Sequence, residues 1–216
     1  MVRRIHLNMT VRKIGTPPGL QVLPVMQLFA ETNLLAGTTN LTTGMTNPQM
    51  VDGTGTVDFT GIPSTYKDLK IVFSNMAHNT SNGSGYRIRM QVNGITATSR
   101  YYTRAGYQAS GGASWNADSV DAFYYGYVYR PENVTWSGTG ELNMRGYSQI
   151  LPYNTRPIDG WWWHINQESY PNMYAGYVFN DSSIGSTPVN RLTFTLDGGP
   201  GFRAISKISL YGINPV

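Results

Sequence analysis

The three histidines are the first residues to consider, because an imidazole can bind a metal ion or transfer a proton near neutral pH. They are His6, His78 and His164, and they lie far apart in the chain. None of them forms a recognisable metal-ligand motif with a second histidine or a carboxylate. We therefore expect these histidines in turns or on the surface, and we predict no metal site.

Serine and carboxylate side chains offer two other routes to catalysis. A Gly-x-Ser-x-Gly nucleophile turn does not occur in the sequence. The most similar stretch, residues 81–85, is typical of a turn-rich loop. A glycosidase needs two carboxyl groups on facing walls of a cleft. The candidate pairs are Asp159 with Glu168 and Glu132 with Glu141. Several of the twelve acidic residues fall in predicted turns, so we predict no catalytic residue, no cofactor and no enzyme.

Aromatic side chains gather in two stretches that could bind a partner. Tyr125 and Tyr127 belong to one stretch, and Trp161, Trp162 and Trp163 are consecutive. Because neighbours on a strand point to opposite faces, Trp162 should face away from the other two tryptophans. In a two-layer sandwich one of these sets would lie outside the core, where it could contact another subunit or stack on a sugar ring. The alternative is that these side chains fill the core and cap its edge.

The net charge of +4 comes from one short segment. Arg3, Arg4, Arg12 and Lys13 fall within the first thirteen residues, and the first acidic residue is Glu31. The rest of the chain carries equal numbers of basic and acidic residues, so these four cations are the whole excess. Four cations would bind phosphates weakly and with strong salt dependence. The sequence therefore disfavours nucleic acid as the main partner.

The same basic segment has a period of two. Apolar and polar residues alternate from position 4 to position 12, which predicts a strand with one apolar and one polar face. This strand is either the first strand of the domain or an arm that pairs with another subunit by strand addition. In the second case the docking residues would be Arg3, Arg4, Ile5, Leu7, Met9, Val11, Arg12 and Lys13.

The composition limits the class of fold. Charged residues make up 13% of the chain, and there are 24 glycines, 12 prolines and 15 tyrosines. An average soluble protein is about 25% charged, and a helical bundle or coiled coil would need far more Ala, Glu, Lys and Leu. Because the chain has no cysteine, a disulfide scaffold, a thiolate zinc site and a cysteine nucleophile are excluded. No apolar run approaches the roughly 20 residues of a membrane helix, so no membrane span is predicted.

From about position 53 onward, short alternating stretches separated by turn residues predict strands. The pair Asn93-Gly94 follows one of them and predicts a tight hairpin to the next. The expected strands are 69–73, 86–92, 95–103, 119–129, 141–149, 160–167, 174–179, 191–196 and 204–213. Eight to ten such strands predict an all-β fold, an antiparallel β-sandwich of jelly-roll type, with a closed barrel as the alternative.

The chain is predicted to divide near position 50. Residues 1–50 would form an extended N-terminal arm and docking segment, with a short helix after Pro24. Residues 51–216 would form the jelly-roll-like sandwich.

Four stretches of the predicted sandwich carry recognisable motifs. They are IPSTYKDLKI at 62–71, YRIRMQVNG at 86–94, SRYY at 99–102 and ISKISLYGI at 205–213. These stretches resemble motifs of virion structural proteins from tailed bacteriophages. The resemblance covers about residues 55–105 and 190–213. No site residue can be carried over from that family, because the shared positions look like strand cores and turns.

The resemblance implies a module on the outside of a virion, in a capsid decoration (cement) protein or a tail fibre. We favour capsid decoration, because the chain is short and lacks the heptad stem with which fibre proteins commonly trimerise. The expected partners are the major capsid protein or tail subunits, together with further copies of this chain, for which the resemblance suggests a trimer. The alternative is a tail-fibre or adhesion module that binds a host glycan.

Overall fold

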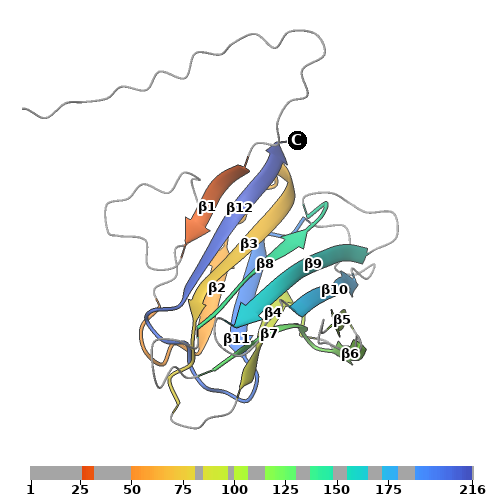
Figure 1. The fold of residues 1–216 in the computed structure, drawn as a ribbon. Coiled ribbons are helices and arrows are strands. Elements are labelled where there is room, and N and C mark those ends of the chain that lie inside the picture. The colour runs from red at the N-terminus through yellow and green to blue at the C-terminus, as the bar shows by residue number, and fades with distance from the viewer. Residues whose placement is uncertain are drawn as a thin grey trace, which may run out of the picture.

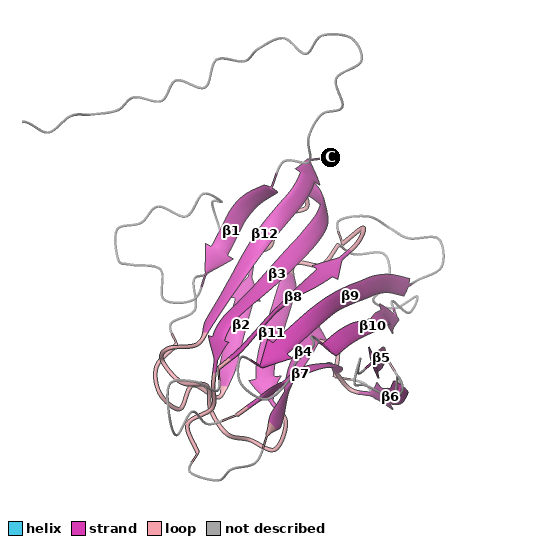
Figure 2. Ribbon diagram, viewed as in Figure 1, coloured by secondary structure: helices cyan, strands magenta, loops and turns pink. Residues whose placement is uncertain are grey.

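The computed structural model describes residues 26–31, 50–80, 85–96, 100–106, 115–129, 137–147, 155–164, 172–179 and 188–215. Within these ranges the chain forms strands, turns and loops and contains no helix (Figure 2). The strands are β1 (Met26–Glu31), β2 (Thr56–Thr60), β3 (Tyr66–Met76), β4 (Tyr86–Val92), β5 (Tyr101–Gly106), β6 (Trp115–Val120), β7 (Phe123–Val128), β8 (Gly138–Met144), β9 (Thr155–His164), β10 (Asn172–Phe179), β11 (Arg191–Leu196) and β12 (Lys207–Pro215).

The strands form two antiparallel sheets of unequal width. The wide sheet has eight strands in the order β1-β12-β3-β8-β9-β10-β5-β6, and the narrow sheet has four in the order β2-β11-β4-β7. The narrow sheet lies behind the wide one, so the molecule is a two-layer sandwich (Figure 1). This confirms the predicted all-β sandwich. The closed-barrel alternative was wrong, because each sheet ends in two edge strands.

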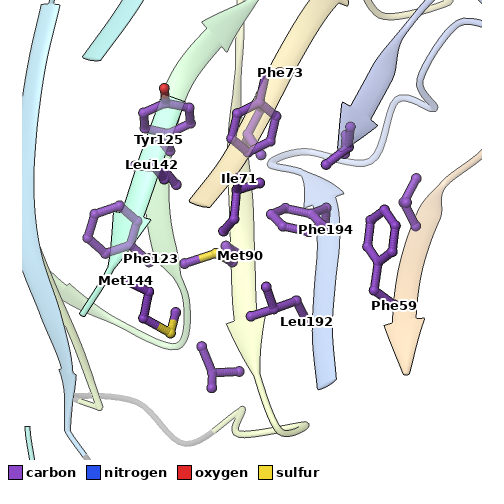
Figure 3. Packing of buried hydrophobic residues seen from close by; sticks show 14 of the residues in the cluster. Phe59, Ile71, Phe73, Met90, Phe123, Tyr125, Leu142, Met144, Leu192 and Phe194 are labelled. Carbon is purple, nitrogen blue, oxygen red and sulfur yellow. The ribbon is translucent and has the colours of Figure 1, made fainter. Parts of the chain in front are cut away.

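The core between the sheets follows from the period of two in each strand. Along β3 the buried residues alternate with partly exposed ones, and β4, β8 and β11 repeat this pattern. Each strand thereby presents one apolar face to the other sheet. Figure 3 shows the inward residues of the two sheets meeting, among them Ile71, Phe73, Met90, Leu192 and Phe194. The rings of Phe73 and Phe194 meet edge to face with centroids 5.6 Å apart.

The predicted hairpin at Asn93-Gly94 was wrong in its second strand. Both residues have positive φ, 50° and 72°, as a tight turn requires. However, β4 pairs with β11 and β7 in the narrow sheet, while β5 belongs to the wide sheet. The buried Tyr101 hydroxyl of β5 reaches across the core, accepts a hydrogen bond from the Val92 amide and donates one to the Ile95 carbonyl. The chain after the turn is thus held by the opposite sheet.

Two other local predictions differ from the structure. Residues 26–31, where a helix was expected after Pro24, form strand β1, which pairs with β12. The sandwich therefore includes residues before the predicted boundary at position 50. The single strand expected at 119–129 is two strands, β6 and β7, which belong to different sheets and meet at Asp121 and Ala122.

Candidate functional site

The predicted docking residues at positions 3–13 lie outside the described residues. Their pairing with another subunit therefore stays a prediction. The carboxylate pairs can be followed only in part, because Glu132 and Glu168 also lie outside the described residues. Glu141 accepts a 2.7 Å hydrogen bond from the Lys70 ammonium, and Asp159 lies 3.4 Å from the Arg145 guanidinium.

The three consecutive tryptophans occupy β9 and divide between its two faces as expected. Trp162 is fully buried, Trp161 is half-buried, and Trp163 is 42% exposed. The alternation along the strand was therefore predicted correctly. What the sequence left open was which face would turn inward, and it is the face of Trp162.

The buried indole of Trp162 lies against three glycines. A Cβ at Gly140 would lie 2.8 Å from the indole, and a Cβ at Gly126 or Gly138 would overlap it more severely. The aromatic ring of Tyr125 meets the indole edge to face at 5.2 Å. Glycines on β7 and β8 thus leave the space that the largest side chain of this core fills.

Tyr125 is also buried, and its hydroxyl joins the two sheets. It donates to the Trp161 carbonyl oxygen and lies 3.2 Å from the Glu141 carbonyl oxygen, which anchors β7 of the narrow sheet to β8 and β9 of the wide sheet. Burial raises the pKa of Tyr125 well above its usual value. Tyr125 and Trp162 are therefore core residues, and the prediction that they offer a stacking surface was wrong. The other three predicted residues, Trp161, Trp163 and Tyr127, are partly or largely exposed and remain candidates for a contact surface.

Tyr127 lies on the outer face of the narrow sheet, which is polar. Among the described residues, three ion pairs cross this face: Arg89 with Asp121 at 2.5 Å, Arg87 with Asp197 at 3.4 Å, and Arg191 with Asp58 at 2.7 Å. The Arg87 guanidinium also lies 4.2 Å above the ring centre of Tyr124. These contacts hold neighbouring strands in register and fix the guanidinium groups.

A hollow of about 280 Å³ opens at one end of this face. It lies where the start of β4, the end of β7 and the turn after β11 come together. Its lining consists of Gly85, Tyr86, Arg87, Tyr127, Asp197 and Gly198. Of these residues only Tyr127 was predicted from the sequence as a site residue, whereas Tyr86 and Arg87 belong to the motif at 86–94. The other polar lining residues, Arg87 and Asp197, looked like ordinary members of a strand and a turn.

The histidine prediction was wrong at His78, which is fully buried rather than in a surface turn. Its Nδ1 lies 3.0 Å from the Thr80 hydroxyl, and its ring meets the ring of Tyr86 edge to face. His164 is part of β9, and His6 lies outside the described residues. Among the residues that the structure describes, no three His, Asp or Glu side chains gather as metal ligands would.

In the described ranges no helix is long and apolar enough to cross a membrane. Comparisons of the chain with protein-family models, with curated proteins and with solved structures gave no match. The likeness of residues 55–105 and 190–213 to phage virion proteins therefore stays a prediction.

Proposed function

We propose that this chain is a non-enzymatic structural component of a bacteriophage virion, an outer capsid decoration (cement) protein that binds the major capsid protein through its N-terminal segment. The observation that carries the proposal is the strand order of the sandwich, taken together with the motifs that resemble phage virion proteins.

The strand order supports a jelly roll with two inserted hairpins. Without β5, β6, β9 and β10, the sheets reduce to β1-β12-β3-β8 and β2-β11-β4-β7. Successive strands of this reduced set alternate between the two sheets, except that β4 is followed by its own neighbour β7. We interpret this as the double Greek key of a jelly roll, an architecture of viral capsid and lectin domains.

The inserted strands support an interface with other subunits. They extend the wide sheet beyond β8, and the strands β9, β10 and β5 come into contact with β7, the edge of the narrow sheet. The outer face of this extension carries the partly exposed Trp161 and Trp163. Exposed tryptophan is characteristic of protein interfaces, because its ring buries a large apolar area while its N–H finds a polar partner.

The test is binding to particles that lack this chain. We expect the full chain to co-sediment with such particles, and a variant without residues 1–14 to lose this binding. Circular dichroism checks that the deletion variant keeps its β-structure. Equal binding by the two forms would refute the docking role of the segment. A cryo-electron microscopy map that places the chain elsewhere than on the capsid surface would refute the assignment to capsid decoration.

The second candidate is a tail-fibre or adhesion module that binds a host-surface glycan. The outward tryptophans of β9 favour it, because flat aromatic rings stack on sugar rings. A glycan array that gives binding with the wild type and none with the Trp163→Ala variant would support this role. A map that places the chain on the tail would favour it over capsid decoration.

A further inference from the structure

We propose that Asn93 is a site of covalent modification, at which the side-chain amide is lost by deamidation through the neighbouring Gly94. The turn that contains these two residues sets the rate of the reaction, because the turn must open before the reaction can occur. The proposal stands apart from the proposed function, since it depends on this turn alone and applies equally to a capsid, a tail or an adhesion protein.

Asn93 and Gly94 form a tight turn after β4, at a place that water can reach. Their φ angles are 50° and 72°, as in the turn that this pair of residues usually forms. Gly94 is exposed, and Asn93 is partly exposed. Because glycine has no side chain, nothing on Gly94 itself shields its backbone nitrogen from a neighbouring group. The pair is therefore chemically suited to attack by the Gly94 nitrogen on the Asn93 side chain.

The reaction needs only these two residues and water. The Gly94 amide nitrogen loses its proton to the solvent and forms a bond to Cγ of Asn93, while the bond from Cγ to Nδ2 breaks and ammonia leaves. The two groups belong to adjacent residues, so this attack is intramolecular. The five-membered imide ring then takes up one water molecule and opens at either carbonyl, which yields aspartate or isoaspartate at position 93. No oxidant or reductant is consumed.

In the closed turn, hydrogen bonds commit the Asn93 side chain to a different segment, residues 188–191. Its Oδ1 accepts hydrogen bonds from the backbone amides of Asn190 at 2.9 Å and Arg191 at 3.1 Å. Its Nδ2 donates to the Pro188 carbonyl at 3.1 Å. The Asn93 side chain must leave these partners before its Cγ can meet the Gly94 nitrogen.

The segment 188–191 is itself held by the core, which strengthens this protection. Val189 is fully buried, and its amide donates a 2.9 Å hydrogen bond to the Tyr147 carbonyl. The Asn190 carbonyl accepts a 3.0 Å hydrogen bond from the Ile62 amide. The three hydrogen bonds of the Asn93 side chain therefore end on a fixed segment, and all three must break when the turn opens.

The number of these hydrogen bonds sets the expected rate. Each hydrogen bond changes the equilibrium between the closed and the open turn by about two- to tenfold. A reaction that proceeds through a local opening is slowed by the small population of the open form. Three hydrogen bonds thus predict a reaction about ten to a thousand times slower in the folded chain than in a chain without these contacts.

Neither product restores the original turn. Aspartate lacks the side-chain N–H group that donates to the Pro188 carbonyl, and isoaspartate adds a carbon atom to the backbone of the turn. Each opening that leads to reaction is therefore irreversible, and the modified fraction grows with the number of openings.

The test measures deamidation of the full chain by tryptic digestion and mass spectrometry. Trypsin releases residues 90–100 as one peptide, because it cleaves after Arg89 and Arg100. A synthetic peptide of the same residues, kept in the same buffer, gives the rate without the turn contacts. We expect aspartate and isoaspartate at position 93 in the folded chain, formed about ten to a thousand times more slowly than in the peptide. A ratio of the two rates outside this range would overturn the proposal.

Matched variants distinguish opening of the turn from unfolding of the whole chain. Val189→Ala and Val128→Ala remove the same methyl groups from two fully buried positions, of which only the first belongs to the segment that holds Asn93. Val189→Ala should accelerate the reaction about threefold or more beyond the acceleration by Val128→Ala. Thermal melts verify that both variants fold. Equal acceleration by the two variants would mean that the reaction passes through global unfolding, which contradicts the proposal.

Urea gives a second measurement that needs no variant. Opening one turn exposes little surface, so concentrations of urea below the unfolding transition should leave the wild-type rate nearly unchanged. A rate that rises in proportion to the globally unfolded fraction would overturn the role of the turn.

Discussion

Replacing Gly138 by alanine tests whether the buried tryptophan determines how the two sheets fit together. Gly138 is the first residue of β8, and its α-carbon lies directly beside the indole of Trp162. A Cβ there would lie 2.7 Å from Cε2 of the indole and closer still to Cζ2. Non-bonded carbon atoms in folded proteins do not approach this closely, so either the indole or strand β8 must move.

The size of the effect follows from what surrounds the indole. The ring cannot retreat, because Gly126 and Gly140 lie against it and the rings of Phe73 and Tyr125 meet it edge to face. Overpacking a core costs about 1–3 kcal/mol, and a site without room to relax belongs at the upper end of that range. At about 3 kcal/mol, a chain of this length would melt roughly 6–12 °C lower.

The assay is thermal and urea unfolding followed by tryptophan fluorescence and circular dichroism. Gly55→Ala is the matched control, because a Cβ at Gly55 meets nothing within 4 Å, and its effect should stay within about 0.5 kcal/mol. The double variant Gly138→Ala/Trp162→Phe should lose less stability than the two single variants combined, since the smaller ring relieves the clash. Equal stability of the Gly138 and Gly55 variants, or strict additivity in the double variant, would refute this account of the core.

Three further predictions concern single side chains. Tyr101→Phe removes the hydroxyl that satisfies two buried backbone groups, and should cost about 1–3 kcal/mol in urea unfolding, whereas retention of full stability would contradict the role of that hydroxyl. Although burial acts to raise the pKa of Asp58, the hydrogen bond from Arg191 lowers it, so its contribution is present above the unfolded-state pKa and is lost as the pH falls through the folded-state pKa. The stability difference between wild type and Asp58→Asn should therefore shrink in melts from about pH 6 to pH 2, and a difference that grows on acidification would disprove the assignment. Trp162→Ala should cost about 3–5 kcal/mol and Trp163→Ala less than about 0.5 kcal/mol, so similar melting temperatures for the two would contradict their opposite placement.

The sequence predicted strands where the signal is local and missed the partners of those strands. The strand at 191–196 has the bounds that its alternation indicates, and the inward residues of 69–73 and 86–92 are also as expected. Alternation depends only on neighbours along the chain. Pairing depends on which other strand buries the same face, so the turn at Asn93-Gly94 formed without the hairpin that it usually closes.

The same limit applies to the candidate sites. Alternation predicted that Trp162 and Trp163 would point to opposite faces of their strand. Which of these faces turns inward depended on glycines in β7 and β8. The hollow beside Tyr127 joins residues 85–87 to residues 197–198, which are far apart in the chain. No spacing in the sequence brings these residues together, because the contact exists only after β4 has paired with both β7 and β11.

The position of β12 in the wide sheet has a consequence for how the chain folds during its synthesis. This strand is the last of the twelve that the structure describes, yet it lies between β1 and β3 and pairs with both. During synthesis β1 leaves the ribosome before β12. Because β1 pairs with β12, it can join the wide sheet only after β12 has been made. Until then both neighbours of β12 expose unpaired backbone edges, which are prone to pair with other chains. A ribosome that stalls before position 207 would thus release a chain whose wide sheet lacks the strand that links β1 to β3.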